Sequence, residues 1–390
     1  SNYDDKSLLR AQAGFFLGSQ LQGLQWTPKC EPVELVLGDR HLGTYLLCEQ
    51  IRVSDGRVAD GYVWEVTDDF DATDVHFRAS RSGLDLCSVD PEVETGSSEF
   101  LSAQQLIADF ESALYGSSFK DANSGYRKYI DVNSFVDWYL VNEIGKNKEA
   151  AFRSDCYFNI NADGKIVMGP IYSFEDFFGN ASDSYEGYAV KKEGWIARMF
   201  EDPYFVKLVA DRWSELSGTR SLLLSELTSQ EARLGKSVVS NESLWNNLGV
   251  AQSAEATKVS SFQKEVDGLK KWIDNRYAWL DIVFSNELKT AKAENAASEN
   301  QIASFSFKYD KNGNSILKDY EAKIEGDSIK LFIPYLVRFD MVADFSVSSG
   351  ASVYVDGIEQ ESGRTINSFL HPLSYKVVSS NGSVRSYSVK

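Results

Sequence analysis

Apolar residues recur at helical spacing over much of the first 290 residues. This spacing predicts helices at residues 8–24, 99–115 and 132–144 and through nearly all of residues 194–288. The acids Asp4 and Asp5 suit the positive end of the first helix. Asp131, Asn133 or Ser134 can cap the third helix, because each side chain accepts a hydrogen bond from a free backbone N–H.

Alternation of apolar and polar residues predicts strands between these helices. The runs Val33–Leu37 and Thr44–Cys48 flank Gly38–His41 and predict a hairpin. The sequence GYVWEV at residues 61–66 predicts a further strand. Residues 156–160 and 165–168 flank an Asp-Gly turn and predict a second hairpin. The first part of the chain is therefore expected to be α+β.

The pattern changes after residue 300, where short alternating runs are separated by Gly-containing turns. The expected strands lie at residues 302–307, 330–333, 352–355 and 386–389, and the turns at Asn312-Gly313, Asp356-Gly357 and Asn381-Gly382. Regular short strands predict a small β-sandwich. Residues 289–300 (KTAKAENAASEN) are small and polar, so the expected division is a domain at 1–288, a linker at 289–300 and a sandwich at 301–390.

Charge is distributed unevenly along the 390 residues. The net charge is −17, and residues 301–390 contain ten acidic and ten basic side chains, so residues 1–300 carry the whole excess. A field of this sign repels phosphate backbones, which argues against a nucleic-acid partner, and it disfavours ATP unless a cation bridges the two. An acidic surface that keeps the protein soluble is the simpler interpretation.

The chain has no apolar run near the roughly 18 uncharged residues of a membrane span. Its opening, SNYDDKSLLR, lacks the pattern of a signal peptide, so any such segment is expected to have been removed or to lie upstream.

The four cysteines and three histidines are scattered, with no pair at metal-ligand spacing. Four cysteines allow two disulfides. Cys48 and Cys156 lie in strand-like apolar runs, so we expect buried free thiols.

Residues 131–180 are the most informative window for chemistry. A carboxylate, Glu149, follows a helix, a predicted hairpin comes next, and a second carboxylate, Glu175, lies just after it. Kinases use this order, with one acid orienting the acceptor hydroxyl and another holding magnesium against the phosphates. A solvated acidic loop is the alternative that spacing alone leaves open.

Several strings in order along residues 1–285 resemble the CotH (spore coat protein H) kinase family. They are SNYDDKSLLRAQAGFFLGSQL, WTPKCEPVELVLGDRHLGTYLLCEQIRV, GYVWEV, DVNSFVDWYLVNEIGKNKE, GPIYSFEDFFG and LKKWIDNRYAWLD. The resemblance implies an atypical protein-kinase-like fold that uses ATP and a divalent cation such as magnesium. It also implies a secreted protein, a surface lipoprotein or another extracytoplasmic protein that acts on secreted or surface proteins.

The chain departs from the family pattern at its chemical positions. The family has Asn-x-Asp where this chain has Asn147-Lys148-Glu149, and Trp-Asp-x-Asp where it has Tyr172-Ser173-Phe174-Glu175. The resemblance therefore implies Glu149 as the catalytic residue and Ser173 and Glu175 as metal ligands, with Asp155 or Asp176 as a substitute ligand. A basic, Gly-containing segment is also expected before SNYDDKS, so the first strands of the kinase-like domain are expected to be missing.

The last 90 residues resemble immunoglobulin-like modules in surface proteins of gut-type Bacteroidetes. The strings ASFSFKYDKN, KIEGDSIKLFIPY, ADFSVSSGASVYVDGIEQESGRTINSF and YKVVSSNGSVRSYSVK carry this resemblance. Such a module spaces or presents its neighbour.

Two hypotheses follow for the whole chain. The first is a surface protein that keeps the kinase-like fold without the chemistry. The second is a magnesium- and ATP-dependent Ser/Thr phosphotransferase, with Glu149 orienting the acceptor hydroxyl and Glu175 on the metal.

Overall fold

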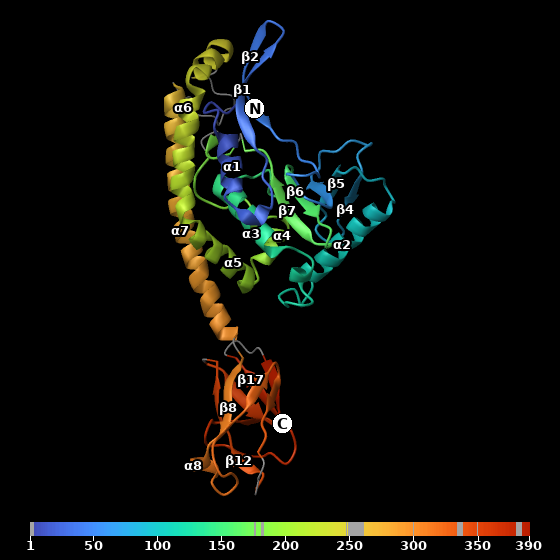
Figure 1. Cartoon of the computed structure of the whole chain (residues 1–390), viewed down its shortest axis with the longest axis vertical. Helices are drawn as coiled ribbons and strands as arrows, with labels where there is room; N and C mark the ends of the chain where they lie inside the picture. The colour runs from blue at the N-terminus through green and yellow to red at the C-terminus, as the bar shows by residue number, and fades with distance from the viewer. Residues whose placement is uncertain are drawn as a thin grey trace. The chain divides into compact units, whose positions relative to one another are not determined.

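The computed structural model divides the protein into two compact units, Ser1–Leu288 and Lys289–Lys390 (Figure 1). It describes residues 4–174, 177–180, 183–246, 248, 261–298, 300–333, 338–348, 350–379 and 384–390, with the backbone alone for residue 288 and residues 291–298. None of the helices in these ranges has an apolar stretch long enough to cross a membrane.

A five-stranded antiparallel sheet lies at the centre of the N-terminal unit. Its strand order is β4-β5-β3-β6-β7, and a separate hairpin is formed by β1 and β2. The strands are β1 (Cys30–Leu37), β2 (Arg40–Cys48), β3 (Tyr62–Val66), β4 (His76–Arg78), β5 (Asp85–Asp90), β6 (Cys156–Ile160) and β7 (Ile166–Ile171). Both expected hairpins and the GYVWEV strand are confirmed, whereas the short strands β4 and β5 were not anticipated.

Helices surround this sheet, with α3 packed on β7 and α1 packed between α3 and α6 (Figure 1). They are α1 (Arg10–Ser19), η1 (Gln22–Leu24), α2 (Ser98–Leu114), η2 (Tyr126–Lys128), α3 (Val132–Gly145), α4 (Gly194–Met199), α5 (Pro203–Glu215), η4 (Leu216–Gly218), α6 (Thr219–Trp245) and α7 (Phe262–Ser298). Since α7 continues to Ser298, most of the expected linker at 289–300 is helical.

Short polar side chains fix where these helices begin. The Asp131 carboxylate accepts hydrogen bonds from the N–H groups of Asn133 and Ser134, so of the three candidates it is Asp131 that caps α3. The expected helix at residues 8–24 is broken instead, because Leu21 is extended between α1 and η1. There the Gly23 N–H donates a hydrogen bond to the Asp137 carboxylate at 2.8 Å and not to a carbonyl oxygen of the helix.

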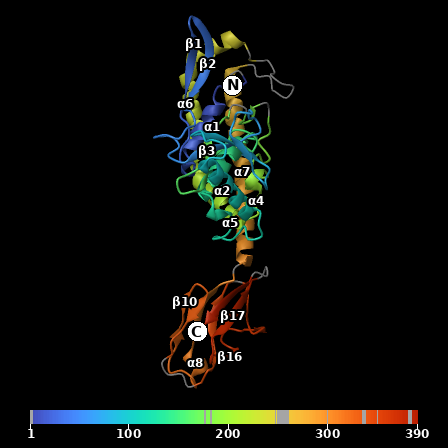
Figure 2. The same cartoon turned by 90° about the vertical axis from the view of Figure 1, so that its right-hand side faces the viewer.

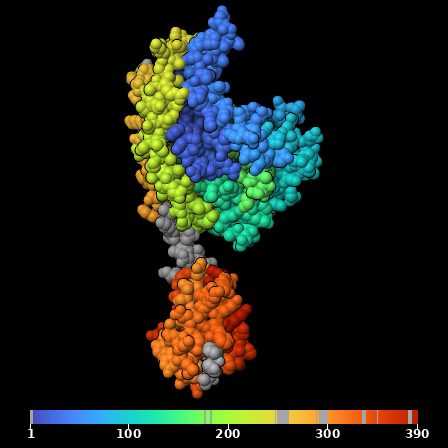
Figure 3. All heavy atoms as spheres, in the orientation of Figure 1, coloured from blue at the N-terminus to red at the C-terminus, as the bar shows by residue number. Residues whose placement is uncertain are grey.

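The β1–β2 hairpin extends from the rest of the N-terminal unit and lies beside the end of α6 in both cartoon views (Figures 1 and 2), as the space-filling view also shows (Figure 3). Asn241 of α6 accepts a hydrogen bond from the N–H of Thr44 at 3.0 Å. Gly43 has a φ of +106°, and a Cβ added there would lie 2.6 Å from the Trp245 indole nitrogen. Glycine at this position therefore lets the hairpin approach the helix closely.

The C-terminal unit is nearly all β. A six-stranded sheet has the order β10-β11-β18-β17-β14-β15, a three-stranded sheet has the order β13-β8-β9, and β12 pairs with β16. The elements are β8 (Ile302–Phe307), α8 (Tyr309–Asn312), β9 (Tyr320–Glu321), β10 (Lys323–Glu325), β11 (Ser328–Lys330), β12 (Asp340–Val342), β13 (Asp344–Val347), β14 (Ser352–Val355), β15 (Ile358–Glu359), β16 (Ile366–Ser368), β17 (Leu373–Val378) and β18 (Val384–Val389).

Three details differ from the alternation pattern. The strand expected at 330–333 ends at Lys330, and β11 pairs with β18 in parallel. Asn312-Gly313 ends the short helix α8 instead of forming a hairpin turn, because the buried Asn312 amide binds the backbone of Val342 in β12. Asp356-Gly357 does turn a hairpin with positive φ, and Asn381-Gly382 lies outside the described residues.

The C-terminal unit has its own buried core, which draws side chains from both larger sheets. Phe305 of β8 and Tyr375 of β17 meet with ring centroids 5.1 Å apart. We therefore expect residues 301–390, expressed alone, to unfold cooperatively on heating, as followed by circular dichroism. A chain without a sigmoidal melt would contradict this division.

Trp272 and Trp279 lie seven residues apart on one face of α7, and both are half-buried against the main core. The Trp279 ring lies 5.3 Å from that of Tyr188 and 4.9 Å from the Arg276 guanidinium.

Replacing Trp279 with Ala should lower the free energy of unfolding by about 2 kcal/mol, between the cost of about 3–5 for a fully buried Trp and about 0.5 for a surface residue. Urea titration measures this change. Trp195→Ala, at a fully buried ring, is the comparison and should cost more. Equal losses for the two variants would show that the partial exposure of Trp279 has no effect.

Candidate functional site

The first string of the resemblance contains DKSLLR, whose polar side chains form a compact hydrogen-bonded cluster at the start of α1. The Asp5 carboxylate accepts hydrogen bonds from the Ser7 N–H at 3.0 Å, the Ser7 hydroxyl at 2.6 Å, and the Arg10 N–H and Nη1 at 2.8 and 2.6 Å. Arg10 Nη2 also donates to Glu265 of α7 at 2.7 Å. Burial lowers the pKa of Arg10, but its two acid partners outweigh this and raise it. The Asp5 bonds lie within this string, and the bond of Arg10 with Glu265 joins α1 to α7.

The loop between α3 and β6 carries the Asn147-Lys148-Glu149 motif. Asn147 is fully buried. Its amide nitrogen donates to the Asn142 side chain at 3.0 Å and to the Ser173 carbonyl oxygen at 3.2 Å, and its amide oxygen accepts from the Ala150 N–H at 3.1 Å. The Asn147 amide therefore holds the loop against the segment after β7, so the structure brings the two expected motifs together.

Two phenylalanines anchor the segment that follows β7. Phe174 and Phe178 are fully buried, with ring centroids 5.9 Å apart. A Cβ on Gly14 of α1 would lie 2.2 Å from Phe174, so this ring reaches its place only because residue 14 is glycine. The Phe178 N–H donates to the Gly145 carbonyl oxygen at 2.9 Å. Ser173 is thereby fixed beside the end of α3.

Backbone strain is concentrated where the loop between α3 and β6 meets the segment after β7, which we call the motif junction. Five of the nine described non-glycine residues with positive φ fall between residues 146 and 178, namely Lys146, Phe152, Asp155, Ser173 and Phe178. Left-handed conformations at such residues cost energy and gather at functional sites. The strained backbone makes this junction the candidate functional site of the N-terminal unit.

The proposed catalytic and metal residues occupy different surroundings. Glu149 is exposed, and among the described residues its carboxylate has no hydrogen-bond or ion-pair partner. Asp155 precedes β6, and its N–H donates to Glu65 of β3 at 3.0 Å. Since Cys156 pairs with Ile171, Asp155 and Ser173 lie at the same end of the sheet. Glu175 and Asp176 lie outside the described residues.

Two lysines of the motif loop were not anticipated as part of the site. Lys146 and Lys148 contact the two carboxylate oxygens of Asp183 at 3.2 and 2.9 Å. Burial raises the pKa of Asp183, but the two lysines outweigh it and hold that pKa below its usual value, while burial lowers the pKa of Lys146. The pattern Lys-Asn-Lys marks this basic pair in the sequence, but its partner Asp183, 37 residues from Lys146 and 35 from Lys148, has no such signal.

A buried ion pair supports the junction from behind. Glu143 of α3 and Arg276 of α7 are both fully buried, 2.8 Å apart. Glu143 also accepts from the N–H groups of residues 189–191, and Arg276 donates to the carbonyl oxygens of Tyr185 and Gly187 at 2.7 Å. Trp272 donates to the Asp183 carbonyl oxygen at 2.7 Å. Helix α7 therefore fixes the loop that presents Asp183.

The described residues of this junction do not form a set of magnesium ligands. Magnesium prefers carboxylate oxygens in near-octahedral geometry. Ser173 offers a neutral hydroxyl, the Asn147 amide is used to hold the loop, and Asp183 is paired with two lysines. In the described ranges, no three His, Cys, Asp or Glu side chains are grouped as metal ligands are.

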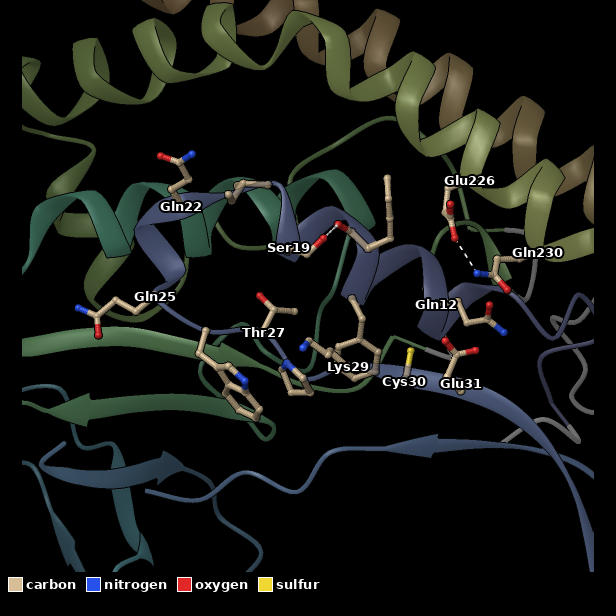
Figure 4. Close-up of a pocket in the computed structure, with 16 residues that line it drawn as sticks. Gln12, Ser19, Gln22, Gln25, Thr27, Lys29, Cys30, Glu31, Glu226 and Gln230 are labelled. Atoms are coloured by element: carbon tan, nitrogen blue, oxygen red, sulfur yellow. Dashed lines mark hydrogen bonds between the residues drawn. The ribbon is translucent and has the colours of Figure 1, made fainter. Parts of the chain in front are cut away.

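A groove of the N-terminal unit lies elsewhere. It has a volume of about 670 Å³ and is lined by α1, η1, the residues leading into β1, and Glu226 and Gln230 of α6 (Figure 4). Glutamine amides, Trp26 and Lys29 give it a mixed, mostly neutral wall. None of Glu149, Asp155 or Ser173 lines it, so it is separate from the motif junction.

The first unit is thus a mixed α+β domain in which a hydrogen bond joins the Asn147 loop to the segment after β7. A model of the family described as CotH kinase protein matches residues 1–280, so the chain belongs to that family. No curated protein matches it.

Proposed function

We propose that this chain is a CotH-kinase-like protein that works outside the cytoplasm, secreted or at the cell surface, and that it does not transfer phosphate in this form. The observation that carries the proposal is the state of the motif junction. The resemblance puts Ser173 where the family has a metal-binding acid, and the Asn147 amide is hydrogen-bonded to the Ser173 carbonyl oxygen and within its own loop.

Charge supports the same proposal. Phosphoryl transfer needs a metal and a fixed cation to offset the charge that develops on the phosphates. The two lysines of the motif loop, Lys146 and Lys148, are both paired with Asp183. The excess of acids in residues 1–300 adds a field that disfavours ATP.

Active Mg- and ATP-dependent Ser/Thr phosphotransfer is the second candidate. The observation in its favour is Glu149, an exposed carboxylate next to a strained backbone of the kind found at functional sites. In this version Glu149 orients the acceptor hydroxyl of a secreted or surface protein and Glu175 binds the metal.

We propose that the C-terminal unit is an immunoglobulin-like module. Support comes from the shared core of its two larger sheets. Such a module presents the family domain to a partner protein. Labelling of intact cells with a membrane-impermeant amine reagent tests the location, because an extracytoplasmic protein is labelled and a cytoplasmic control protein is not.

A phosphate-incorporation assay with labelled ATP and magnesium tests the chemistry. We expect no incorporation by the wild-type chain. Ser173→Asp should create any activity that the remaining scaffold allows, and Asp suits this position because φ is +60° and Asp tolerates the left-handed region. Incorporation by the wild-type chain that is lost in Glu149→Ala would establish the second candidate.

A further inference from the structure

The first hairpin places two cysteines directly opposite each other. Cys30 opens β1, Cys48 closes β2, and the strand register pairs them. In the adjoining pair, the Glu49 N–H donates to the Lys29 carbonyl oxygen at 2.9 Å. Hydrogen-bonded and non-hydrogen-bonded pairs alternate along an antiparallel ladder, so Cys30 and Cys48 form a non-hydrogen-bonded pair.

This position has the spacing that a disulfide needs. Facing Cα atoms in a non-hydrogen-bonded pair are about 4.5 Å apart, inside the range of about 4.4–6.8 Å that disulfides span. Facing side chains also point to the same face of the hairpin. The neighbouring Cys48 thiol and burial raise the pKa of Cys30.

The pair is accessible from solvent, in contrast to the other two cysteines. Cys30 and Cys48 are half-buried, which corrects the expectation that Cys48 is buried, whereas Cys156 is fully buried as expected. Cys30 lies on the wall of the open groove, between Lys29 and Glu31 (Figure 4). Cys87 is also buried, and strand β3 separates it from Cys156.

We propose that Cys30 and Cys48 form a disulfide when they meet an external disulfide, and that this bond fastens the open end of the hairpin. One thiol loses its proton to solvent and attacks the external disulfide, which forms a mixed disulfide and releases one thiolate. The second cysteine loses its proton and attacks the hairpin sulfur of the mixed disulfide, which releases the second thiolate. Two protein thiols are oxidised, and one external disulfide is reduced to two thiols.

The bond would add to the support that the hairpin receives from α1 and α6. A two-stranded ribbon is marginally stable in water, and apart from its contacts with α1 and α6 this one is exposed. Leu35, Leu37 and Leu47 are 40%, 71% and 65% exposed. A bond between Cys30 and Cys48 closes the whole hairpin into a loop, which restricts its opened states.

The test treats the purified full chain with oxidised glutathione, blocks free thiols with iodoacetamide and maps the peptides by mass spectrometry. We expect the intact mass to fall by two hydrogen atoms and one linked peptide to join Cys30 to Cys48. Cys87 and Cys156 should be alkylated only after denaturation. Cys156→Ser is the matched control and should leave the linkage unchanged, whereas Cys48→Ser should abolish it.

Hydrogen exchange of the wild-type chain gives a second measurement that needs no variant. Oxidation should slow exchange of the β1 and β2 amides by about tenfold or more, since closing a loop of this size restrains its opening, and reduction should reverse it. Persistent glutathione adducts on Cys30 or Cys48, a linkage to Cys87 or Cys156, or four alkylated thiols after oxidation would each overturn the proposal.

Discussion

Replacing Arg276 with Met should lower the free energy of unfolding by about 3–5 kcal/mol, because it leaves a buried carboxylate without its charge partner. Arg276 and Glu143 are both 0% exposed. The guanidinium also binds the Tyr185 and Gly187 carbonyl oxygens, so the variant leaves several buried acceptors unpaired. Urea titration followed by Trp fluorescence measures the loss.

An exposed ion pair in the same unit is the matched control. Lys207 and Asp211 form an i,i+4 pair in α5, with 46% and 41% of their side chains exposed. Lys207→Met should change stability by less than about 0.5 kcal/mol. The double variant Arg276→Met, Glu143→Gln should recover part of the lost stability, because it removes the stranded charge as well. A loss in Arg276→Met no larger than in Lys207→Met would refute the role given to this pair.

Replacing Asp5 with Ala should cost a similar amount, about 3–5 kcal/mol. The change removes a buried carboxylate that accepts four hydrogen bonds and leaves Arg10 with Glu265 as its charged partner. Since Glu265 belongs to α7, the change should also weaken the attachment of α1 to that helix. Chemical denaturation measures the stability, and hydrogen exchange of α1 amides measures the local effect.

Asp121 supplies a matched control for this variant. Its carboxylate also accepts bonds from two backbone N–H groups and a serine hydroxyl, but it is exposed. Asp121→Ala should therefore cost much less than Asp5→Ala, since water replaces the lost bonds. Equal losses of stability in the two variants would show that burial adds nothing to the contribution of the Asp5 hydrogen bonds.

The sequence predicted those parts of the fold that depend on local pattern. Alternation around Gly38-Asp39 predicted the β1–β2 hairpin, and Asp131 was among the caps considered for α3. The strand β4, three residues long, is too short to show a period. The end of β11 at Lys330 could not be predicted either, because it depends on pairing with distant strand β18.

The candidate site was predictable only in part, because several of its contacts join segments far apart in the sequence. Motif order predicted that acids of the Asn147 loop and of the segment after β7 act together; a hydrogen bond joins the two segments, and the roles of their residues stay a prediction. The ion pair of Lys146 with Asp183 and the support from Arg276 depend on contacts between segments far apart in sequence. The local sequence around Lys146 and Arg276 does not indicate which distant residue each of them contacts.

The most direct test of the central claim is a calorimetric titration of the purified chain with Mg-ATP. The claim is that the family scaffold is present while the motif junction cannot hold a magnesium-bound nucleotide. It predicts no binding in the micromolar range for the wild-type chain and stronger binding in Ser173→Asp. Micromolar binding by the wild-type chain, abolished in the double variant Glu149→Ala, Glu175→Ala, would contradict it.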